Sequence, residues 1–247
     1  MRIAVIADVH GNLRALEAVQ VDLAKRTPDL VVNLGDNVSG PLQASATADL
    51  LMNESYIHIR GNHDRQLVDR PAAGMGPSDR AAHGQLNSRQ LEWLADLPAD
   101  QMIEDDVLLC HGSPGNDLRY LLEKVDGDRV RLDSPFEVRE RLGEVGARLV
   151  LCGHSHIPRI VSLPGGVWIV NPGSVGLQAY SDDAPLHYVE TGSPHARYAV
   201  IDWERKTPRV DFITVEYDWE AASNQAAQAN RPDWSYALAT GYALRVS

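Results

Sequence analysis

Aspartate, asparagine and histidine residues follow directly on five short apolar runs of this sequence. The five groups are Asp8-Val9-His10, Gly35-Asp36, Gly61-Asn62-His63-Asp64, His111-Gly112 and Gly153-His154-Ser155-His156. Five of the nine histidines belong to these groups. Imidazole and carboxylate ligands together suit Mn, Fe, Zn or Co, and the lack of thiolates disfavours a structural zinc site. The pattern therefore predicts a metal site assembled from segments far apart in the chain.

The spacing within the groups indicates how ions could be held. Asp8 and His10 are two residues apart, so in extended backbone both side chains face one side and can hold one ion. His154 and His156 have the same spacing. A carboxylate can bridge two cations, and ions about 3.5–4 Å apart hold the attacking and leaving oxygens of an in-line displacement and lower the pKa of bound water. These residues predict phosphate-ester hydrolysis at a dinuclear centre, where metal-bound water can supply a metal-bound hydroxide near neutral pH.

Hydrophobic periodicity predicts the elements that carry these groups, because short apolar runs indicate strands and apolar residues at helical spacing indicate helices. The predicted strands are Ile3–Ala7, Leu30–Leu34, Tyr56–Ile59, Val107–Leu109 and Leu149–Leu151, separated by helices over 13–28, 44–53 and 133–146. This alternation predicts a parallel or mixed sheet with helices on its faces, and such sheets form their sites at the carboxyl ends of the strands. Glycines beside the candidate ligands permit sharp turns and close approach of a metal or substrate.

Residues 65–100 depart from the alternation. A stretch rich in Gly and Pro leads into an amphipathic segment, which predicts a helical insert beside the site, with a plain connector as the alternative. Trp93 lies at helical spacing with Leu94 and Leu97, a pattern more typical of the core than of a residue that stacks on a nucleobase.

The last third of the chain is enriched in β-branched and aromatic residues, which indicates strands over Val167–Val170, Tyr198–Trp203 and Val210–Val215. Between them, residues 177–196 are predicted to form a long polar loop. The Ala-rich tail from about residue 219 is predicted to be helical. Since no repeat or linker stands out, residues 1–247 are predicted to form one domain.

Composition excludes several classes of protein. Hydrophobic residues make up 44% and charged residues 23%, which is ordinary for a globular chain. The net charge of −11 argues against a protein that coats nucleic acid, because phosphate backbones are bound by clustered Lys and Arg. No apolar stretch approaches the roughly 20 residues of a membrane span, and the N-terminal run is too short for a signal peptide. We therefore expect a cytoplasmic protein whose Cys110 and Cys152 are buried free thiols, with a disulfide as the alternative.

The ordered set of five groups resembles the calcineurin-like metallophosphoesterase superfamily. The phrase Asn171-Pro172-Gly173-Ser174-Val175-Gly176 further resembles the compact prokaryotic phosphodiesterase branch of that superfamily. The resemblance covers roughly residues 3–215 and leaves the C-terminal tail outside. It implies an α/β fold of four layers, an αββα sandwich with two mixed β-sheets packed face to face and flanked by helices.

The resemblance also implies a role for each matching residue. Asp8, His10 and His156 would hold one divalent ion, Asp36 would bridge, and Asn62, His111 and His154 would complete the second site. Manganese is the expected metal, with Fe, Zn, Co, Ni or Mg as alternatives. His63 would be the general acid that protonates the leaving oxygen or hydrogen-bonds the phosphoryl group, and Asn62 would also help to position the phosphate.

The second group departs from the protein-phosphatase branch of the superfamily. That branch continues with an Asp-Arg pair that orients the histidine and binds phosphate, whereas this chain has Asn37-Val38-Ser39-Gly40. The departure disfavours a Ser/Thr phosphoprotein phosphatase and leaves His63 without an evident orienting partner, for which Asp64 is the adjacent candidate. The favoured function is a phosphodiesterase or phosphatase on a small molecule or nucleotide. A catalytically inactive scaffold is a further alternative, although every inferred ligand is present.

Other polar residues give weaker signals. Arg60 and His58, before the third group, are expected to pack on a strand or face the surface. The segment 177–196 contains acids, histidines and a tyrosine, which could line a substrate-selecting rim or simply be solvated. These residues are Tyr180, Asp182, Asp183, His187, Glu190 and His195. The oligomeric state is left open by the sequence.

Overall fold

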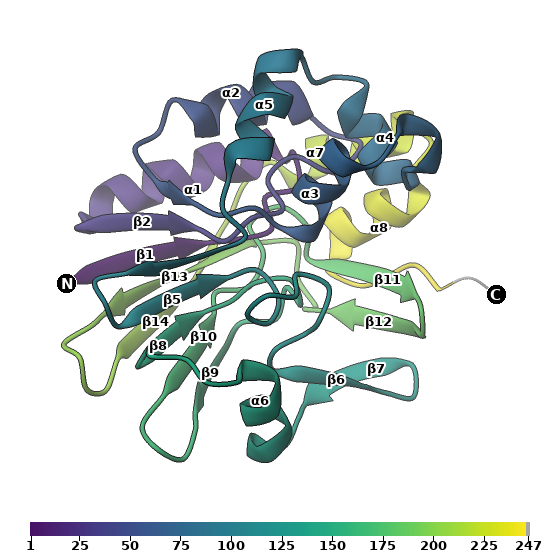
Figure 1. Cartoon of the computed structure of the whole chain (residues 1–247). Coiled ribbons are helices and arrows are strands. Elements are labelled where there is room, and N and C mark those ends of the chain that lie inside the picture. Colours follow the sequence, from purple (N-terminus) through teal and green to yellow (C-terminus); the bar gives the residue numbers. More distant parts are fainter. Residues whose placement is uncertain (246–247) are drawn as a thin grey trace.

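Two mixed five-stranded sheets form the centre of the structure, a computed structural model that describes residues 1–245 (Figure 1). The first sheet has the order β14-β13-β1-β2-β3 and the second the order β4-β5-β8-β10-β9. The strands of the first sheet are β1 (Arg2–Ile6), β2 (Leu30–Asn33), β3 (Ile57–His58), β13 (Ala196–Asp202) and β14 (Arg209–Val215). Those of the second are β4 (Asp100–Ile103), β5 (Val107–Cys110), β8 (Leu149–Leu151), β9 (Arg159–Ser162) and β10 (Trp168–Asn171).

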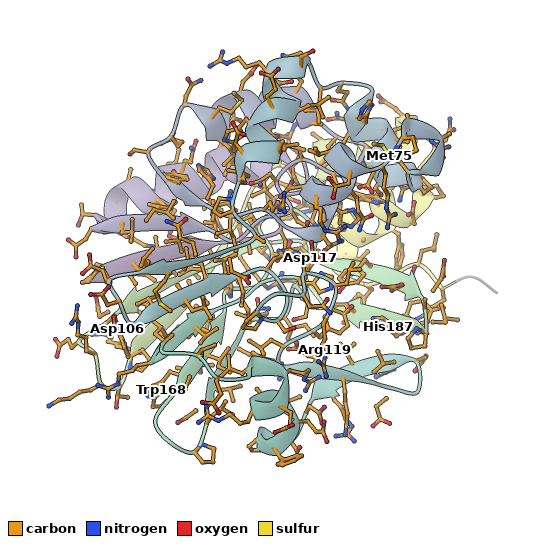
Figure 2. The ribbon with its side chains drawn as sticks, in the orientation of Figure 1. Met75, Asp106, Asp117, Arg119, Trp168 and His187 are labelled. Atoms are coloured by element: carbon orange, nitrogen blue, oxygen red, sulfur yellow. The ribbon has the colours of Figure 1, made fainter. Side chains whose placement is uncertain are left out.

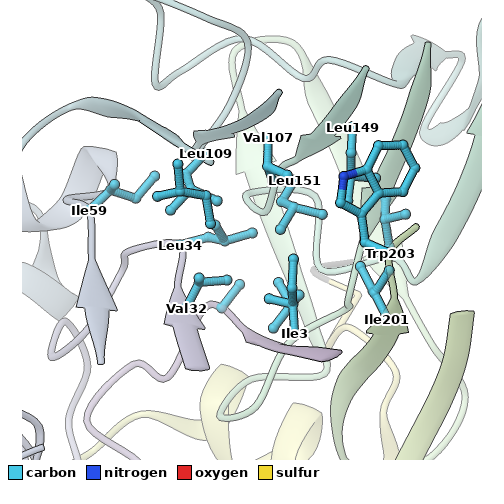
Figure 3. Close-up of a cluster of buried hydrophobic side chains, with 14 residues drawn as sticks. Ile3, Val32, Leu34, Ile59, Val107, Leu109, Leu149, Leu151, Ile201 and Trp203 are labelled. Atoms are coloured by element: carbon cyan, nitrogen blue, oxygen red, sulfur yellow. The ribbon is translucent and has the colours of Figure 1, made fainter. Parts of the chain in front are cut away.

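The two sheets pack face to face through apolar side chains that alternate along each strand (Figure 3). Ile3 and Val32 from the first sheet meet Leu109, Leu149 and Leu151 from the second, and all five are fully buried. This inner layer fixes the two sheets relative to each other. The loops after β1, β2, β5 and β8 therefore start from a rigid base.

Helices cover the outer faces of both sheets (Figure 1). The helix α1 (Leu13–Arg26) packs Leu16 and Val19 against Ala4 of β1, and α2 (Ala44–Met52) lies beside α1. On the second sheet, α6 (Pro135–Leu142) packs Val138 against buried residues of β5 and β8, and the side chain of its N-cap, Ser134, accepts a hydrogen bond from the Glu137 N–H. The expected αββα layers are thus present. Within residues 1–245, no helix has both the length and the apolar character needed to span a bilayer.

Residues 1–245 also form a third, four-stranded sheet of order β11-β12-β7-β6, in addition to the two expected mixed sheets. Its strands are β6 (Glu123–Asp126), β7 (Arg129–Leu132), β11 (Ala179–Asp183) and β12 (Leu186–Glu190). The predicted loop over 177–196 is therefore largely a β-hairpin. In β12, His187 and Val189 are buried on alternate positions, and the polar composition of the segment hides this period from a search for apolar residues.

Two groups of helices lie at the carboxyl ends of the central strands. The segment after β3 forms α3 (Asn62–Asp69), a short 3-10 helix over Ala72–Gly74, α4 (Pro77–His83) and α5 (Ser88–Asp96). The tail forms α7 (Trp219–Gln228) and α8 (Pro232–Thr240), and α8 packs against β11. Figure 1 shows α3, α4 and α8 on the same side of the molecule, above the hairpin β11–β12.

Candidate functional site

The candidate metal ligands of the five sequence groups converge at the carboxyl ends of β1, β2, β5 and β8. Two clusters offer ligand atoms within 4.8 Å of one another. Their members are Asp8, His10 and His156 in one cluster, and Asp36, His111 and His154 in the other. Asp36 links the clusters, since its Oδ2 lies 3.3 Å from His111 Nε2 and 3.8 Å from His10 Nε2. Asn62 joins the second cluster, with Oδ1 3.1 Å from His111 Nε2.

The backbone at these positions is held in an unfavourable conformation. Asp8, His10, Asp36, His154 and His156 all have φ between 51° and 67°, the left-handed region that non-glycine residues rarely adopt. Each such residue costs about 1–3 kcal/mol, and the conformation persists only where the surrounding structure enforces it. Backbone hydrogen bonds enforce it here, from Asp8 N–H to the Gly35 carbonyl (3.0 Å) and from His10 N–H to the Asp36 carbonyl (2.9 Å). The strain turns the ligand side chains toward a common point.

The segment 171–176 fixes these loops through side-chain hydrogen bonds to their backbone. Asn171 Nδ2 donates to the Gly153 carbonyl (2.7 Å), and Ser174 Oγ donates to the Asp8 carbonyl (2.9 Å). A Cβ on Gly176 would lie 1.7 Å from the Val9 carbonyl oxygen, so only glycine fits at this position. The sequence motif is therefore a support for the loops of Asp8 and His154, and it contributes no member of either cluster.

Three imidazoles are oriented by backbone carbonyls. The Nδ1 atoms of His10, His111 and His156 lie 3.1, 2.8 and 2.7 Å from the carbonyl oxygens of Ser39, Leu34 and Leu177. With Nδ1–H donating, each Nε2 presents a lone pair to the site, the arrangement usual for metal-ligating histidines. The Nε2 atoms of His10 and His156 then face each other at 3.2 Å. Two lone pairs at this distance repel, and a cation between them relieves the repulsion.

The site also contains an orphaned carboxylate oxygen. Oδ2 of Asp8 is buried and has no hydrogen-bond partner within residues 1–245, although buried polar atoms normally have one. Near Nε2 of His111 lie two further acceptor oxygens, Asp36 Oδ2 and Asn62 Oδ1. A donor set of carboxylates, an amide oxygen and imidazole nitrogens fits divalent transition-metal ions.

The pKa values of four cluster residues favour their ligating forms. Burial lowers the pKa of His10 and of His154 to about 4, so both are neutral at pH 7. Burial opposes ionisation of Asp8, but attraction to His156 outweighs it and leaves the pKa of Asp8 below its usual value. The pKa of Asp36 is likewise lowered, by His111 and His63. His111 differs: burial lowers its pKa, but Asp36 raises it to about 10, and a bound cation would replace that proton.

His63 lies beside the clusters and is held by a carboxylate that the sequence did not reveal. Its Nδ1 is 2.6 Å from Oδ1 of Asp79, which is buried at the first turn of α4. Ser39 Oγ donates to the same Asp79 oxygen (2.7 Å). Burial alone would lower the pKa of His63, but Asp36 and Asp79 raise it to about 9. In the absence of metal, the His63 ring is therefore protonated on both nitrogens and positively charged at neutral pH.

The suggestion that Asp64 orients His63 was wrong. The Asp64 carboxylate accepts hydrogen bonds from Asn37 N (2.9 Å), Asn37 Nδ2 (2.8 Å) and Gly61 N (2.9 Å), so it fixes the second and third groups to each other. Adjacent residues in a helix point in different directions, which is why the neighbour of His63 cannot reach its ring. Only the placement of α4 by the fold could identify Asp79, and its sequence neighbourhood carries no distinctive signal.

A cavity of about 450 Å³ opens beside the clusters, within the range of small-molecule sites. Its floor is formed by His10, Asp36, Asn62, His63, His154 and His156. Its walls come from the insert (Gly76, Ser78), the hairpin (Tyr180 to Asp183) and the tail (Arg231, Asp233, Trp234 and others). Among these residues Arg231 is the sole arginine or lysine, whereas Asp182, Asp183 and Asp233 are acidic.

The polar residues of 177–196 divide between the cavity and a hydrogen-bonded support. Tyr180, Asp182 and Asp183 line the cavity. His187 of β12, labelled in Figure 2, is buried and its Nε2 lies 2.8 Å from Tyr120 Oη, which in turn lies 2.7 Å from Tyr180 Oη. The rings of Tyr120 and Tyr180 pack on His154 and His156 at centroid distances of 4.9 and 4.7 Å. These aromatic contacts cover the ligand imidazoles from the hairpin side.

The remaining sequence candidates lie away from the cavity. Glu190 binds Arg245, and His195 lies 3.7 Å from Glu216 near the surface. His58 is bonded to Asn33 on β2 and packs edge-to-face on Trp93, so both residues belong to the strand–helix packing, as expected for Trp93. Cys110 and Cys152 are free and buried, which confirms the expectation of unpaired thiols.

This chain belongs to the calcineurin-like phosphoesterase superfamily. The family model described as "Calcineurin-like phosphoesterase superfamily domain" matches residues 1–193, which include every member of the two clusters and His63. The match confirms the resemblance found in the sequence. It ends before α7 and α8, so the tail that lines the cavity lies outside the matched region.

Full-length relatives share the fold. A metallophosphoesterase from Sphaerobacter thermophilus is 27% identical, with a TM-score of 0.73 over 98% of this chain and 99% of that one. The hypothetical protein PH1004 from Pyrococcus horikoshii OT3 is 21% identical, with a TM-score of 0.70 over 97% and 98%. In sequence, the chain is 25% identical to "Uncharacterized protein MJ0912" of Methanocaldococcus jannaschii over 94% of both chains. The coverage shows that the tail has a counterpart in these proteins.

Proposed function

We propose that this protein is a metal-dependent phosphodiesterase or phosphatase that hydrolyses a small-molecule or nucleotide phosphate ester. The observation that supports this most strongly is the pair of ligand clusters joined by Asp36, with His63 at their edge and a cavity in front of them. A cavity of this size suits a small substrate.

In this proposal the clusters would hold two divalent ions, with Mn the first choice and Fe, Zn, Co, Ni or Mg as alternatives. Asp8, His10 and His156 would hold one ion, Asn62, His111 and His154 would hold the other, and Asp36 would contribute to both. Bound ions would supply Lewis acidity toward a phosphoryl oxygen and would acidify a water molecule. The fixed Nδ1–H bonds of His10, His111 and His156 spare the ring reorientation that binding would otherwise require.

His63 supplies the proton for the leaving oxygen. Its Nδ1–H is held by Asp79, so Nε2 is the nitrogen left to donate toward the cavity. The elevated pKa of His63, about 9 without metal, keeps that proton in place at pH 7, and two nearby cations would lower the pKa toward a value suited to proton transfer. Asn62, next to His63 in the sequence, would help to position the phosphoryl group in addition to holding the second ion.

The proposal is tested with protein stripped of metal and reloaded with Mn²⁺. Hydrolysis of bis-p-nitrophenyl phosphate, nucleotides and a phosphopeptide is compared under the same conditions. We expect Mn²⁺-dependent turnover of the small esters. Dominant phosphopeptide turnover would favour the protein phosphatase, and no turnover with no retained transition metal would favour an inactive scaffold.

Further expectations belong to the same proposal. The protein is proposed to work in the cytoplasm on a small phosphoester, without coating nucleic acid and without a membrane partner. The net charge of −11 supports the expectation that the protein does not coat nucleic acid, because a net negative charge disfavours binding of a polyanion.

A further inference from the structure

The C-terminal helix α8 reaches the candidate site although it lies outside the matched family region. Trp234 is buried, and its ring centroid lies 5.9 Å from that of His10. A Cβ on Gly40 would lie 2.5 Å from Trp234 Cη2, so the indole sits directly on the second ligand loop. The tail therefore packs directly against the site.

Arg231, at the start of α8, bridges the tail to the insert. Its Nε and Nη2 donate to the two carboxylate oxygens of Asp233 (2.9 and 2.6 Å), and its Nη1 donates to Ser78 Oγ (3.0 Å). A bidentate pair fixes the plane of a guanidinium group. The Arg231 side chain is only 18% exposed. Because the guanidinium plane is fixed, Nη1 stays directed toward Ser78 Oγ.

Ser78 and Asp79 are consecutive residues in the first turn of α4. The helix has seven residues, and helices of this length are positioned by tertiary contacts because their intrinsic stability is low. Its C-terminal half is anchored by buried Ala82 in the cluster that contains Leu67 and Leu94. Side-chain hydrogen bonds tie this first turn to other parts of the fold: Asp79 contacts Ser39 and His63, and Ser78 accepts the hydrogen bond from Arg231 of the tail.

We propose that Arg231 is a positioning residue for His63, acting through Ser78 and Asp79. The hydrogen bond to Ser78 sets the first turn of α4, that turn sets Asp79, and Asp79 sets the His63 ring. This inference rests on the proposed function, in which His63 protonates the leaving oxygen. It makes the tail part of the proton-donating machinery, in addition to a wall of the cavity.

Four variants test the proposal: Arg231→Met, Ser78→Ala, Ser78→Thr and Arg245→Met. Ser78→Thr keeps the hydroxyl that accepts the hydrogen bond, so it is the rescuing partner of Ser78→Ala. Arg245 is the matched control, because it is also a tail arginine with two carboxylate partners, Asp128 and Glu190, but lies outside the cavity lining.

The readout is the dependence of kcat on the leaving group. Diphenyl phosphate releases a more basic phenolate than bis-p-nitrophenyl phosphate and needs protonation more. We expect Arg231→Met and Ser78→Ala to lower kcat for diphenyl phosphate about 10-fold, within the roughly 10²-fold that a 1 Å misplacement can cost. The loss for bis-p-nitrophenyl phosphate should be clearly smaller, and Ser78→Thr and Arg245→Met should match the parent protein.

Equal losses on both esters would overturn the proposal and indicate a general structural role. A rise in KM with unchanged kcat would overturn it in favour of direct substrate binding by Arg231. A parent protein inactive on both esters would instead count against the proposed function. The positioning role then has its own readout in metal-free protein, the NMR signal of the His63 Nδ1 proton bonded to Asp79. This signal should shift or broaden in Arg231→Met and Ser78→Ala but not in Arg245→Met, and an unchanged signal would reject the role.

Discussion

Oδ1 of Asp79 lies 2.6 Å from Nδ1 of His63, although the residues are 16 positions apart and belong to different helices, α4 and α3. Ser39, in the second ligand group, donates to the same oxygen. The second group of the protein-phosphatase branch has an Asp-Arg pair, which this chain lacks. Here the insert supplies the carboxylate and Ser39 supports it, so the orienting partner of the histidine comes from another part of the chain.

Replacing Asp79 by Asn is expected to lower kcat with little change in bound metal. The amide keeps the shape but removes the negative charge that holds the His63 Nδ1–H and sustains the high pKa of the ring. We expect a loss of about 10–100-fold, a part of the 10²–10⁴-fold that positioned proton transfer contributes. Steady-state kinetics and elemental analysis measure the two effects. Asp126→Asn, in an exposed ion pair with Arg131 outside the cavity lining, is the control, and an equal loss there would contradict the role of Asp79.

His63→Ala should retain both metal ions and lose most of its turnover. The ring is absent from both ligand clusters, so its removal leaves the ligands in place, whereas the proton donor is gone. The expected fall in kcat is about 10²–10⁴-fold. Metal content is measured by elemental analysis on the same sample. Loss of metal in this variant would show that His63 is a ligand and would overturn its assignment as the acid.

Asp36→Ala is expected to lose one or both ions, because Asp36 Oδ2 lies between the imidazoles of the two clusters. The number of Mn²⁺ ions bound per chain, measured by calorimetric titration, should fall below that of the parent. Asp117→Ala, which breaks a pair with Arg65 outside the clusters, should bind metal normally. Full occupancy in Asp36→Ala would reject the bridging role.

Gly176→Ala should destabilise the fold and displace the first ligand loop. The added Cβ would lie 1.7 Å from the carbonyl oxygen of Val9, the residue between Asp8 and His10. Neither atom can move away without a shift of the backbone. We expect the free energy of unfolding to fall by more than about 4 kcal/mol, a loss typical of such backbone strain. Denaturant unfolding measures the change. In Gly146→Ala the new Cβ meets nothing within 4 Å, so that variant should unfold nearly as the parent does.

His58 should make the protein less stable in acid. Burial lowers its pKa to about 4, below the value near 6.5 of an unfolded chain. The stabilisation is therefore fully present above pH 6.5 and is lost as the pH falls from 6.5 toward 4, because the unfolded state takes up the proton first. His58→Gln keeps an acceptor for Asn33. Its free energy of unfolding should fall less over this pH range than that of the parent protein, and the difference between the two falls should reach about 2 kcal/mol at 1.36 kcal/mol per pKa unit. Denaturant titrations in chelator at pH 7 and pH 4.5 compare the two proteins, and identical pH dependence would contradict the prediction.

The sequence by itself determined the strands of the inner layer and the residues of the clusters. Apolar runs such as those ending before Asp8 and Asp36 report burial on both faces of a strand, and polar residues at their ends then share one edge of the sheet. Local pattern was sufficient there because each signal lies within a few residues. The expected helices α1, α2 and α6 follow from the same reasoning.

Only the tertiary structure decided which distant residues support the site. The strands β6, β7, β11 and β12 are short and polar, so their half-buried faces leave no clear apolar period, and the third sheet was missed. Asp79 contacts His63 across 16 positions of the sequence, and Arg231 contacts Ser78 across 153 positions. Both contacts join side chains of different helices. Such contacts depend on how whole helices pack, and no pattern of neighbouring residues encodes that packing.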